Sequence, residues 1–352
     1  MWRGRSLIFV KNNMNILMGN NTLDILAGSE TWIYTLAAEM VKQGHKVTAF
    51  SHSLGFIATK LESLGVKCIS EINSSVGGKI KPFSPFLEES SDEKYDVIIC
   101  NHYAITRYMH DKLPNIPIIA TVHGILHGEG DQIWPEHPVT EFKVDQYISV
   151  SEEVQDKLKS SYGIDSIIIR NFFDLERFKK EKKKIPEGKQ PEKFLVNSNY
   201  WGKDDEINMV IKDTANFFNA QFMGIGVNFA QTWETEEVIG QVDVVWGMGR
   251  SVIEGACMGK LSVIHGRWGT GGVLTPESYE VMKKTNFSGR KYGGEANSLA
   301  ASSDLVNDIN AYFNSKNIDA VYKIIKENHD VKKAAAQFVE IANKLISEKI
   351  CD

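Results

Sequence analysis

Several features that commonly indicate a protein's chemistry are scarce in this sequence. It contains four cysteines, Cys68, Cys100, Cys257 and Cys351, without a C-x-x-C pair, so neither a zinc site nor a disulfide framework is indicated. No apolar stretch approaches the roughly 18 to 20 residues that a membrane-spanning helix needs. The net charge is only −5, which gives no general attraction to nucleic acid. We therefore expect a cytoplasmic protein with reduced thiols.

The chain has 352 residues, which suits two domains of roughly 150 to 200 residues each. Its first 13 residues, "MWRGRSLIFVKNN", combine a basic start with a short apolar patch. The patch is too short for the core of a signal peptide, and no cleavage site of small residues follows. We expect residues 1–13 to form an N-terminal extension, with the first strand beginning near Met14.

The first half alternates short β-rich runs with helical stretches, the pattern of βαβ units in a parallel sheet. The segment 14–19 reads as a strand, 29–44 as an amphipathic helix that Gly44 ends, and 45–50 as the next strand. Further strands are expected at 66–70, 96–101, 117–123, 146–151 and 166–171. Several of these runs are almost wholly apolar, as fits strands that helices cover on both faces. This predicts an N-terminal Rossmann-like domain over 14–178.

A charged segment, "ERFKKEKKKIPEGKQPEK", follows at 176–193, and we expect a linker over 179–193. Its basic run could touch an anionic membrane surface, but it lacks an apolar face, so we favour a solvated hinge. Strands and helices then alternate again, which predicts a second Rossmann-like domain over 194–330. The tail, 331–352, reads as a helix that could cross back to the first domain.

The expected fold is thus α/β, with two Rossmann-like domains facing each other across a cleft. Ligands of open parallel sheets gather outside the carboxyl ends of the strands, so residues directly after strands are the candidates. In the first half these are Gly28, which allows a close backbone approach, and His123, which could bond a sugar hydroxyl or move a proton. His123 could equally be a structural histidine, and the role of His102, which is similarly placed, stays open.

In the second half, Lys203 follows a strand and could meet phosphate oxygens. The segment "WGMGRSVIEGACMGKLSVI", 246–264, supplies a short glycine loop and then the first turn of a helix. A second glycine-rich run, 266–272, follows the next strand. The candidate ligand-binding residues of these two loops are Gly249, Arg250, Ser251, Glu254, Gly271 and Gly272.

Glu254 has two explanations that stay open at this point. In the first, Ser251 is the N-cap of the helix and Glu254 completes a capping box with it. In the second, the loop holds a diphosphate at the helix N-terminus, and the glutamate accepts hydrogen bonds from ribose hydroxyls. The two are exclusive only if the carboxylate is fully used on its own helix.

Taken together, these segments resemble the retaining GT-B glycosyltransferases of glycosyltransferase family 4, over about residues 14 to 275. "ILAGSETWIYTLAAEMVKQGHKVTAFS" resembles the family's opening, a glycine pair, a glutamate, a helix and "GH-x-V". The stretch from "YISVSEEVQDKL" to "IIIRNFFDLERF" resembles the end of its first domain, and "GMGRSVIEGACMGKLSVI" resembles its donor-binding segment "EA-x-A-x-G-x-P-V-I".

The resemblance implies roles for four of the candidates. Glu254 would bind the nucleotide ribose, Lys203 the diphosphate and His123 the transferred sugar, while Gly28 would allow the donor and acceptor to approach closely. Three departures accompany it. Trp246 replaces a glutamate that contacts the donor sugar in the family, which makes Trp246 a sugar-pocket candidate. Asn197 and Ser198 replace a glycine and an arginine, a loss for which Arg250 could substitute, and Ala27 replaces the first glycine of the pair.

These expectations add up to a hexosyltransferase of glycan biosynthesis. It would move a sugar from a nucleoside diphosphate sugar to a glycan, lipid-linked or small-molecule acceptor, with retention, as the family implies. No D-x-D motif occurs in the sequence, so neither a metal nor another cofactor is expected. The alternatives are a nucleotide-sugar epimerase of the same fold and a non-catalytic nucleotide- or sugar-binding relative. A dinucleotide oxidoreductase is disfavoured, because "GMGRSV" lacks the third glycine of its fingerprint.

Overall fold

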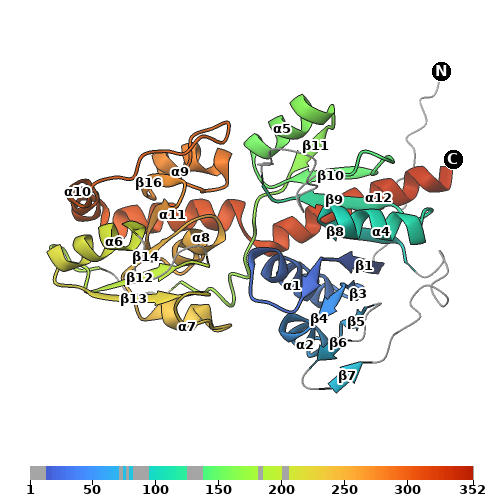
Figure 1. Ribbon diagram of the computed structural model, residues 1–352, viewed down its shortest axis with the longest axis horizontal. Coiled ribbons are helices and arrows are strands. Elements are labelled where there is room, and N and C mark those ends of the chain that lie inside the picture. Colours follow the sequence, from blue (N-terminus) through green and yellow to red (C-terminus); the bar gives the residue numbers. More distant parts are fainter. Residues whose placement is uncertain are drawn as a thin grey trace. The chain divides into compact units, whose positions relative to one another are not determined.

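The structure, a computed structural model, describes residues 13–70, 74–76, 79–81, 95–124, 138–180, 185–199 and 206–351. The chain divides into two compact units, whose elements Figure 1 labels. Unit 1 comprises residues 1–150, 154–169 and 331–352, and unit 2 comprises 151–153 and 170–330. We describe each unit by itself.

Unit 1 is built on a seven-stranded parallel sheet with the order β11-β10-β9-β8-β1-β3-β5. Its strands are β1 (Asn15–Gly19), β3 (Lys46–Phe50), β5 (Lys67–Ile69), β8 (Val97–Asn101), β9 (Ile118–Val122), β10 (Gln146–Ser149) and β11 (Ser166–Ile168). Short pairs outside this sheet are β2 (Thr22–Leu23) with β4 (Ser53–Leu54), and β6 (Ser74–Val76) with β7 (Lys79–Lys81). Because the strands are parallel, the carboxyl ends of β1, β8 and β9 meet at one edge of the sheet.

The helices of unit 1 are α1 (Gly28–Lys42), α2 (Phe56–Glu62), α4 (Tyr103–Lys112), α5 (Glu152–Tyr162) and α12 (Val331–Cys351). One core cluster joins α4 and α5 to the sheet and includes Leu17, Ile98, Met109 and Leu158. Helix α1 packs on α2 and α12. The rings of Trp32 and Phe338 lie 5.8 Å apart in an edge-to-face contact. The end of the chain is therefore part of the core of unit 1.

Unit 2 is built on a five-stranded sheet with the order β13-β12-β14-β15-β16, in which only β16 is antiparallel to its neighbour. Its strands are β12 (Lys193–Asn197), β13 (Gln221–Ile225), β14 (Val244–Gly247), β15 (Leu261–Gly266) and β16 (Gly269–Val273). Its helices are α6 (Glu206–Phe217), α7 (Thr235–Gly240), α8 (Arg250–Cys257), α9 (Pro276–Met282), α10 (Ser302–Tyr312) and α11 (Ser315–Asn328), with a 3-10 turn, η2 (Lys283–Thr285).

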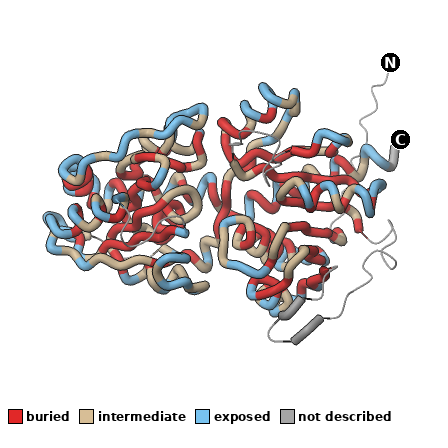
Figure 2. Tube along the Cα trace, in the orientation of Figure 1, coloured by how far each residue is buried: buried red, intermediate tan, exposed pale blue. Residues whose placement is uncertain are grey.

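Strands β12 and β14 of unit 2 supply two separate cores, which explains why they are apolar at nearly every position. Phe194, Val196 and Trp246 belong to a cluster with α6 and α10. Leu195 and Val245 alternate with these residues along the strands, so their side chains point to the other face of the sheet, and they belong to a cluster with α8, α9 and α11. Strands β12, β14 and β15 are buried over almost their whole length, whereas the edge strands β13 and β16 are mostly half-buried (Figure 2). Helices thus cover both faces of the sheet, as its apolar runs predict.

The expected α/β class with two Rossmann-like domains is confirmed. The boundary lies between residues 169 and 170, earlier than the expected end of the first domain at 178. Phe173 and Phe178 belong to a core of unit 2, and Phe173 N–H donates to His329 O at 2.8 Å. The described parts of the expected linker, 179–193, also lie within unit 2, because the side chain of Ile185 packs on its core.

The second glycine-rich run is not a loop. Residues 261–266 and 269–273 form the hairpin of β15 and β16, and Arg267 and Trp268 are its two-residue turn. Glycines are poor strand residues, so the run reads as a loop in the sequence. Pairing with β15 overrides that preference.

Of the helices that the structure describes, none combines the length and apolarity that crossing a bilayer requires.

Candidate functional site

Glu254 lies in α8 beyond its first turn, and no capping box holds it there. The helix begins at Arg250, with Gly249 as its N-cap, and no side chain caps it. Ser251 is consequently the second residue of the helix, and Glu254 lies five residues beyond the cap. The capping-box interpretation of Ser251 and Glu254 is therefore wrong. Gly249 has a φ of 57°, a left-handed conformation that favours glycine at this turn.

Glu254 is instead bonded to the end of a neighbouring strand. The Nδ2 amide of Asn197, the last residue of β12, donates to Oε2 of Glu254 at 3.0 Å. The residue is only 9% exposed, and this burial raises the pKa of Glu254. The nearby guanidinium groups of Arg250 and Arg177, and the Asn197 hydrogen bond, oppose that shift. A carboxylate is thus held at the carboxyl edge of the sheet, where ligands of such folds bind.

Arg250, expected as a cation for the diphosphate, is bound inside unit 2. Its Nη1 donates to the carbonyl oxygen of Phe172 at 3.2 Å, and its guanidinium carbon lies 4.5 Å from the centre of the Phe173 ring. Burial lowers the pKa of Arg250, and the charge of Glu254 opposes this. Its Nε has no hydrogen-bond partner among the residues that the structure describes. The guanidinium charge of Arg250 acts on Glu254, but one of its nitrogens already donates to the backbone carbonyl of Phe172.

A second arginine, Arg177, belongs to the same charged cluster and was not predicted. Its Nε and Nη2 donate to the two carboxylate oxygens of Glu236 at 2.9 and 2.8 Å. Nη2 also donates to the carbonyl oxygen of Trp233, and the guanidinium lies 4.3 Å from the centre of the Trp233 ring. In the sequence, Arg177 is the second residue of the charged segment 176–193, where a solvated side chain is the usual expectation.

Trp246 is a core residue and lines no open surface of unit 2. Its side chain is fully buried, and its ring lies 5.9 Å from that of Phe194 and 5.8 Å from that of His265. The sugar-pocket assignment of Trp246 therefore does not fit its position. The reason is the strand itself, since Trp246 is the third residue of β14, before the loop begins.

Two further candidates of the second half lie elsewhere, in a strand. Gly271 and Gly272 are in β16, and a Cβ atom on Gly271 would come within 2.7 Å of Met282 Sδ and 2.9 Å of Ile264 Cγ2. Gly271 is thus required for packing, which accounts for it without a ligand. Lys203 lies outside the described residues.

In unit 1, Gly28 is the first residue of α1, directly after the Ala27 N-cap. No side chain caps this helix either. A long helix whose first turn lacks a side-chain cap presents N–H groups that can bind an anion or an oxygen of a ligand. The placement is compatible with the expected close approach of a ligand at Gly28.

His123, directly after β9, ends a line of hydrogen-bonded side chains. Its Nε2 lies 3.0 Å from Oδ1 of Asn101, whose Nδ2 donates to Oδ1 of Asn20 at 3.2 Å. Asn20 Nδ2 in turn donates to Oε1 of Glu30 at 3.2 Å. Asn20 and Asn101 are fully buried, and Glu30 is 2% exposed. His123 is half-buried, so it forms the accessible end of the line.

Glu30 and His102 complete this polar group. Burial raises the pKa of Glu30, while hydrogen bonds from its own backbone, from Ser29 and from Asn20 oppose the shift. His102 has a φ of 73°, which is a strained value for a residue with a side chain, and its ring centre lies 6.2 Å from that of His123. Burial lowers the pKa of His102 to about 4, so it is neutral at pH 7.

The sequence signal for Asn20 and Asn101 was present, because each is a polar residue at the end of an apolar strand. What was missing was the strand order. Only the order β9-β8-β1 shows that the ends of these strands are neighbours.

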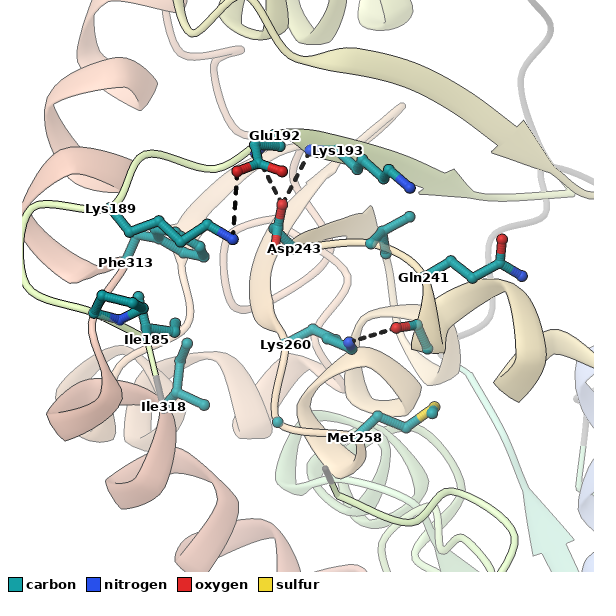
Figure 3. Close-up of a pocket in the computed structure, with 14 residues that line it drawn as sticks. Ile185, Lys189, Glu192, Lys193, Gln241, Asp243, Met258, Lys260, Phe313 and Ile318 are labelled. Carbon is teal, nitrogen blue, oxygen red and sulfur yellow. Dashed lines mark hydrogen bonds and ion pairs between the residues drawn. The ribbon is translucent and has the colours of Figure 1, made fainter. Parts of the chain in front are cut away.

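A cavity of about 220 Å³ lies at the opposite, amino-terminal edge of the unit 2 sheet (Figure 3). Its charged side chains bind groups within its own walls: Lys189 Nζ lies 3.5 Å from Glu192 Oε1, and Asp243 Oδ2 accepts the Glu192 N–H at 2.8 Å. Lys260 Nζ donates to the carbonyl oxygen of Gly240 at 2.9 Å. None of the predicted site residues lines it, so we assign it no part in the site.

Comparisons with known proteins bear on the fold of the chain. Residues 26–177 match the family described as Glycosyltransferase Family 4. Among curated proteins, none matches this chain in sequence. A glycosyltransferase from Rickettsia africae ESF-5 has a similar structure, with 14% identity, a TM-score of 0.64, and coverage of 96% of this chain and 99% of that one.

Two further structures share the fold. Alr3699/HepE from Anabaena, in complex with UDP-glucose, has 14% identity and a TM-score of 0.59, over 96% of this chain and 99% of that one. The sucrose-phosphate synthase from Thermosynechococcus elongatus has 11% identity and a TM-score of 0.55, over 95% and 100%. Residues 26–177 therefore resemble Glycosyltransferase Family 4, and the chain as a whole has the GT-B fold.

Proposed function

We propose that this protein transfers a sugar from a nucleoside diphosphate sugar to an acceptor hydroxyl. In the proposal, unit 2 binds the donor and unit 1 binds the acceptor, which is a glycan, a lipid-linked sugar or a small molecule. The observation that carries it is the buried carboxylate of Glu254, bonded to Asn197 at the carboxyl edge of the sheet and not to its own helix terminus. A carboxylate in this position is suited to accept hydrogen bonds from the two ribose hydroxyls.

The chemistry requires stabilisation of the leaving diphosphate. As the bond between the sugar and the diphosphate breaks, negative charge grows on the diphosphate oxygens. The N-terminus of α8 and the guanidinium of Arg250 are the positive groups of the described chain nearest to Glu254 in sequence, and we propose that they bind those oxygens. Lys203 is proposed as a third contact. With these groups in place, we propose transfer without a metal and with retention.

Calorimetric titration with UDP, GDP and ADP tests the donor site directly. UDP is the first probe, because the Anabaena protein binds UDP-glucose. We expect micromolar binding of one nucleotide to the wild type, and at least tenfold weaker binding to Glu254→Gln, which keeps the shape of the side chain but loses the charge. Glu277→Gln is the matched control, since Glu277 is an exposed glutamate in the first turn of α9.

The expected result for the control is unchanged affinity. Equal affinity of Glu254→Gln and wild type would contradict the proposed ribose contact. If none of the three nucleotides binds, the proposed donor site is wrong. Activity that persists in EDTA would support transfer without a metal.

A second candidate, a nucleotide-binding protein without transferase activity, is favoured by one observation. Trp246, in place of the family's sugar-binding glutamate, is part of the core and offers no carboxylate to a donor sugar. Release of UDP from UDP-glucose in the presence of mixed acceptors separates the two candidates. Turnover supports the transferase, and nucleotide binding without turnover supports the second candidate. For either function we propose a cytoplasmic location, since Cys68, Cys100 and Cys257 are free, buried thiols.

A further inference from the structure

The line of hydrogen bonds in unit 1 fixes the orientation of each group in it. Asn20 donates through Nδ2 to the carbonyl oxygen of Thr22 at 2.7 Å and to Oε1 of Glu30 at 3.2 Å. A backbone carbonyl can only accept a hydrogen bond, so the amide nitrogen of Asn20 has to face it. Both oxygens of Glu30 also accept, since Ser29 Oγ donates to Oε2 at 2.9 Å.

The orientation of Asn20 determines that of Asn101. With Nδ2 of Asn20 turned toward Thr22, its Oδ1 faces Asn101 and can only accept. Asn101 must therefore present its Nδ2 to Asn20, which is the contact found at 3.2 Å. The Oδ1 of Asn101 is left facing His123 at 3.0 Å. Since that oxygen accepts only, the Nε2 atom of His123 must carry a hydrogen.

Burial makes this assignment a firm one. Asn20 and Asn101 are both 0% exposed, so water does not replace a lost partner for either amide. Turning either amide over would bring two nitrogen donors or two oxygen acceptors face to face. The carbonyl oxygen of Thr22 thus fixes the orientation of the Asn20 amide, which fixes that of Asn101. The Asn101 amide in turn fixes which nitrogen of His123 carries the hydrogen.

We propose that Asn20 and Asn101 are positioning residues that hold the imidazole of His123 in the tautomer with its hydrogen on Nε2. In the neutral ring Nδ1 is then the acceptor. The consequence, which rests on the proposed function, is that His123 accepts a hydrogen bond from a hydroxyl group of the acceptor or the transferred sugar. Glu30 supports the line through its bond to Asn20 without touching His123.

The test is an NMR measurement on the whole protein without any ligand. The protein is labelled with ¹⁵N at its nine histidines, and the signals of His123 are identified by their loss in His123→Gln. Two-bond and three-bond ¹H–¹⁵N correlations distinguish the two neutral tautomers. In the wild type we expect a single tautomer with Nε2–H, and an Hε2 proton that is protected from exchange with water.

Asn20→Ser tests the transmission, because residue 20 changes while Asn101 and His123 stay. The shortened side chain frees the Asn101 amide to turn over, so we expect the Nδ1–H tautomer to become detectable and the Hε2 proton to exchange faster. Thr121→Val is the matched control. Thr121 is equally buried and lies two residues before His123, but it takes no part in the line, so its spectrum should match the wild type.

A wild-type spectrum showing Nδ1–H would overturn the proposal, and so would an Asn20→Ser spectrum identical to the wild type. The other histidine signals report whether Asn20→Ser keeps its fold. If it does not, Asn101→Ser replaces it, and we expect loss of the protected Hε2 proton.

Titration with UDP separates this proposal from the proposed function. Asn20→Ser should bind UDP as the wild type does, because residue 20 belongs to unit 1. A correct tautomer without nucleotide binding would refute the function and leave the positioning role intact. Nucleotide binding together with the Nδ1–H tautomer would refute the positioning role and leave the proposed function intact.

Discussion

The amide of Asn197 and the carboxylate of Glu254 meet at 3.0 Å, although the residues are 57 positions apart in the chain. The contact joins the last residue of β12 to the fifth residue of α8. Burial raises the pKa of Glu254 and so disfavours its charged form, which leads to the first prediction.

Glu254→Gln should stabilise unit 2 at neutral and alkaline pH. The folded protein raises the pKa of Glu254 through burial, so the stability linked to its protonated form is lost as the pH rises through that pKa. Glutamine is neutral throughout, and its Oε1 can still accept from Asn197. Thermal unfolding at pH 4 and at pH 8 measures the effect, and the gain in Tm over the wild type should be larger at pH 8. A lower Tm at both values would mean that the carboxylate has a structural role after all.

Trp246→Ala should lower the free energy of unfolding by about 3 to 5 kcal/mol, the usual cost of removing a buried large aromatic side chain. Trp246→Phe should cost much less, because it fills most of the volume. Nucleotide affinity, measured below the unfolding temperature, should be the same in the wild type and Trp246→Phe. Urea denaturation gives the free energies. A marked loss of nucleotide affinity in Trp246→Phe with unchanged stability would show that Trp246 takes part in nucleotide binding.

Arg250→Met should affect diphosphate binding and stability separately. Loss of the contact with the Phe173 ring should destabilise unit 2 by about 0.5 to 2 kcal/mol. If Arg250 binds the diphosphate, the affinity for UDP should fall at least tenfold while the affinity for uridine stays unchanged. Calorimetry with both compounds checks this. Equal changes for UDP and uridine would confine Arg250 to its contacts with Phe172 and Phe173.

Gly271→Ala should destabilise unit 2 by about 1 to 3 kcal/mol, the range for forcing an extra methyl group into a packed site. Its Cβ would lie 2.7 Å from Met282 Sδ and 2.9 Å from Ile264 Cγ2. The affinity of the folded protein for its nucleotide should not change. Met282→Ala, added to Gly271→Ala, should recover part of the loss. A drop in affinity at unchanged stability would instead place Gly271 at the ligand.

Acid should destabilise the protein as the pH falls from about 6.5 toward 4. Burial lowers the pKa of His329 to about 4, so the stability that its neutral form contributes is present above the unfolded pKa and is lost below it. A shift of this size corresponds to on the order of 3 kcal/mol. His329→Gln should flatten the pH dependence of the unfolding free energy in this window. An unchanged slope would assign the acid sensitivity to other groups.

The sequence was informative where periodicity and strand ends decide the structure. The apolar runs predicted the parallel strands of both units, and the rule about their carboxyl ends pointed to His123 and Glu254. It misled where local composition and tertiary pairing disagree. Gly271 and Gly272 read as a loop but pair with β15.

Contacts between distant segments could not be predicted at all. Asn101 needed the strand order to be linked with Asn20, and Arg177 stands within a charged run, where a solvated side chain is the usual expectation. Trp246 was placed at a ligand because a family position was carried over by spacing alone. The strand of this chain continues through that position, which turns its side chain into the core.

The contribution of α12 to unit 1 has a consequence for how the protein is made. Residues 170–330 form one continuous stretch, whereas unit 1 needs both its early segments and the helix that begins at Val331. On the ribosome, the second half can complete its core while the first still waits for the partner of Trp32, which is Phe338. Domains generally fold as units during synthesis. In this chain we expect the unit that starts first to finish last.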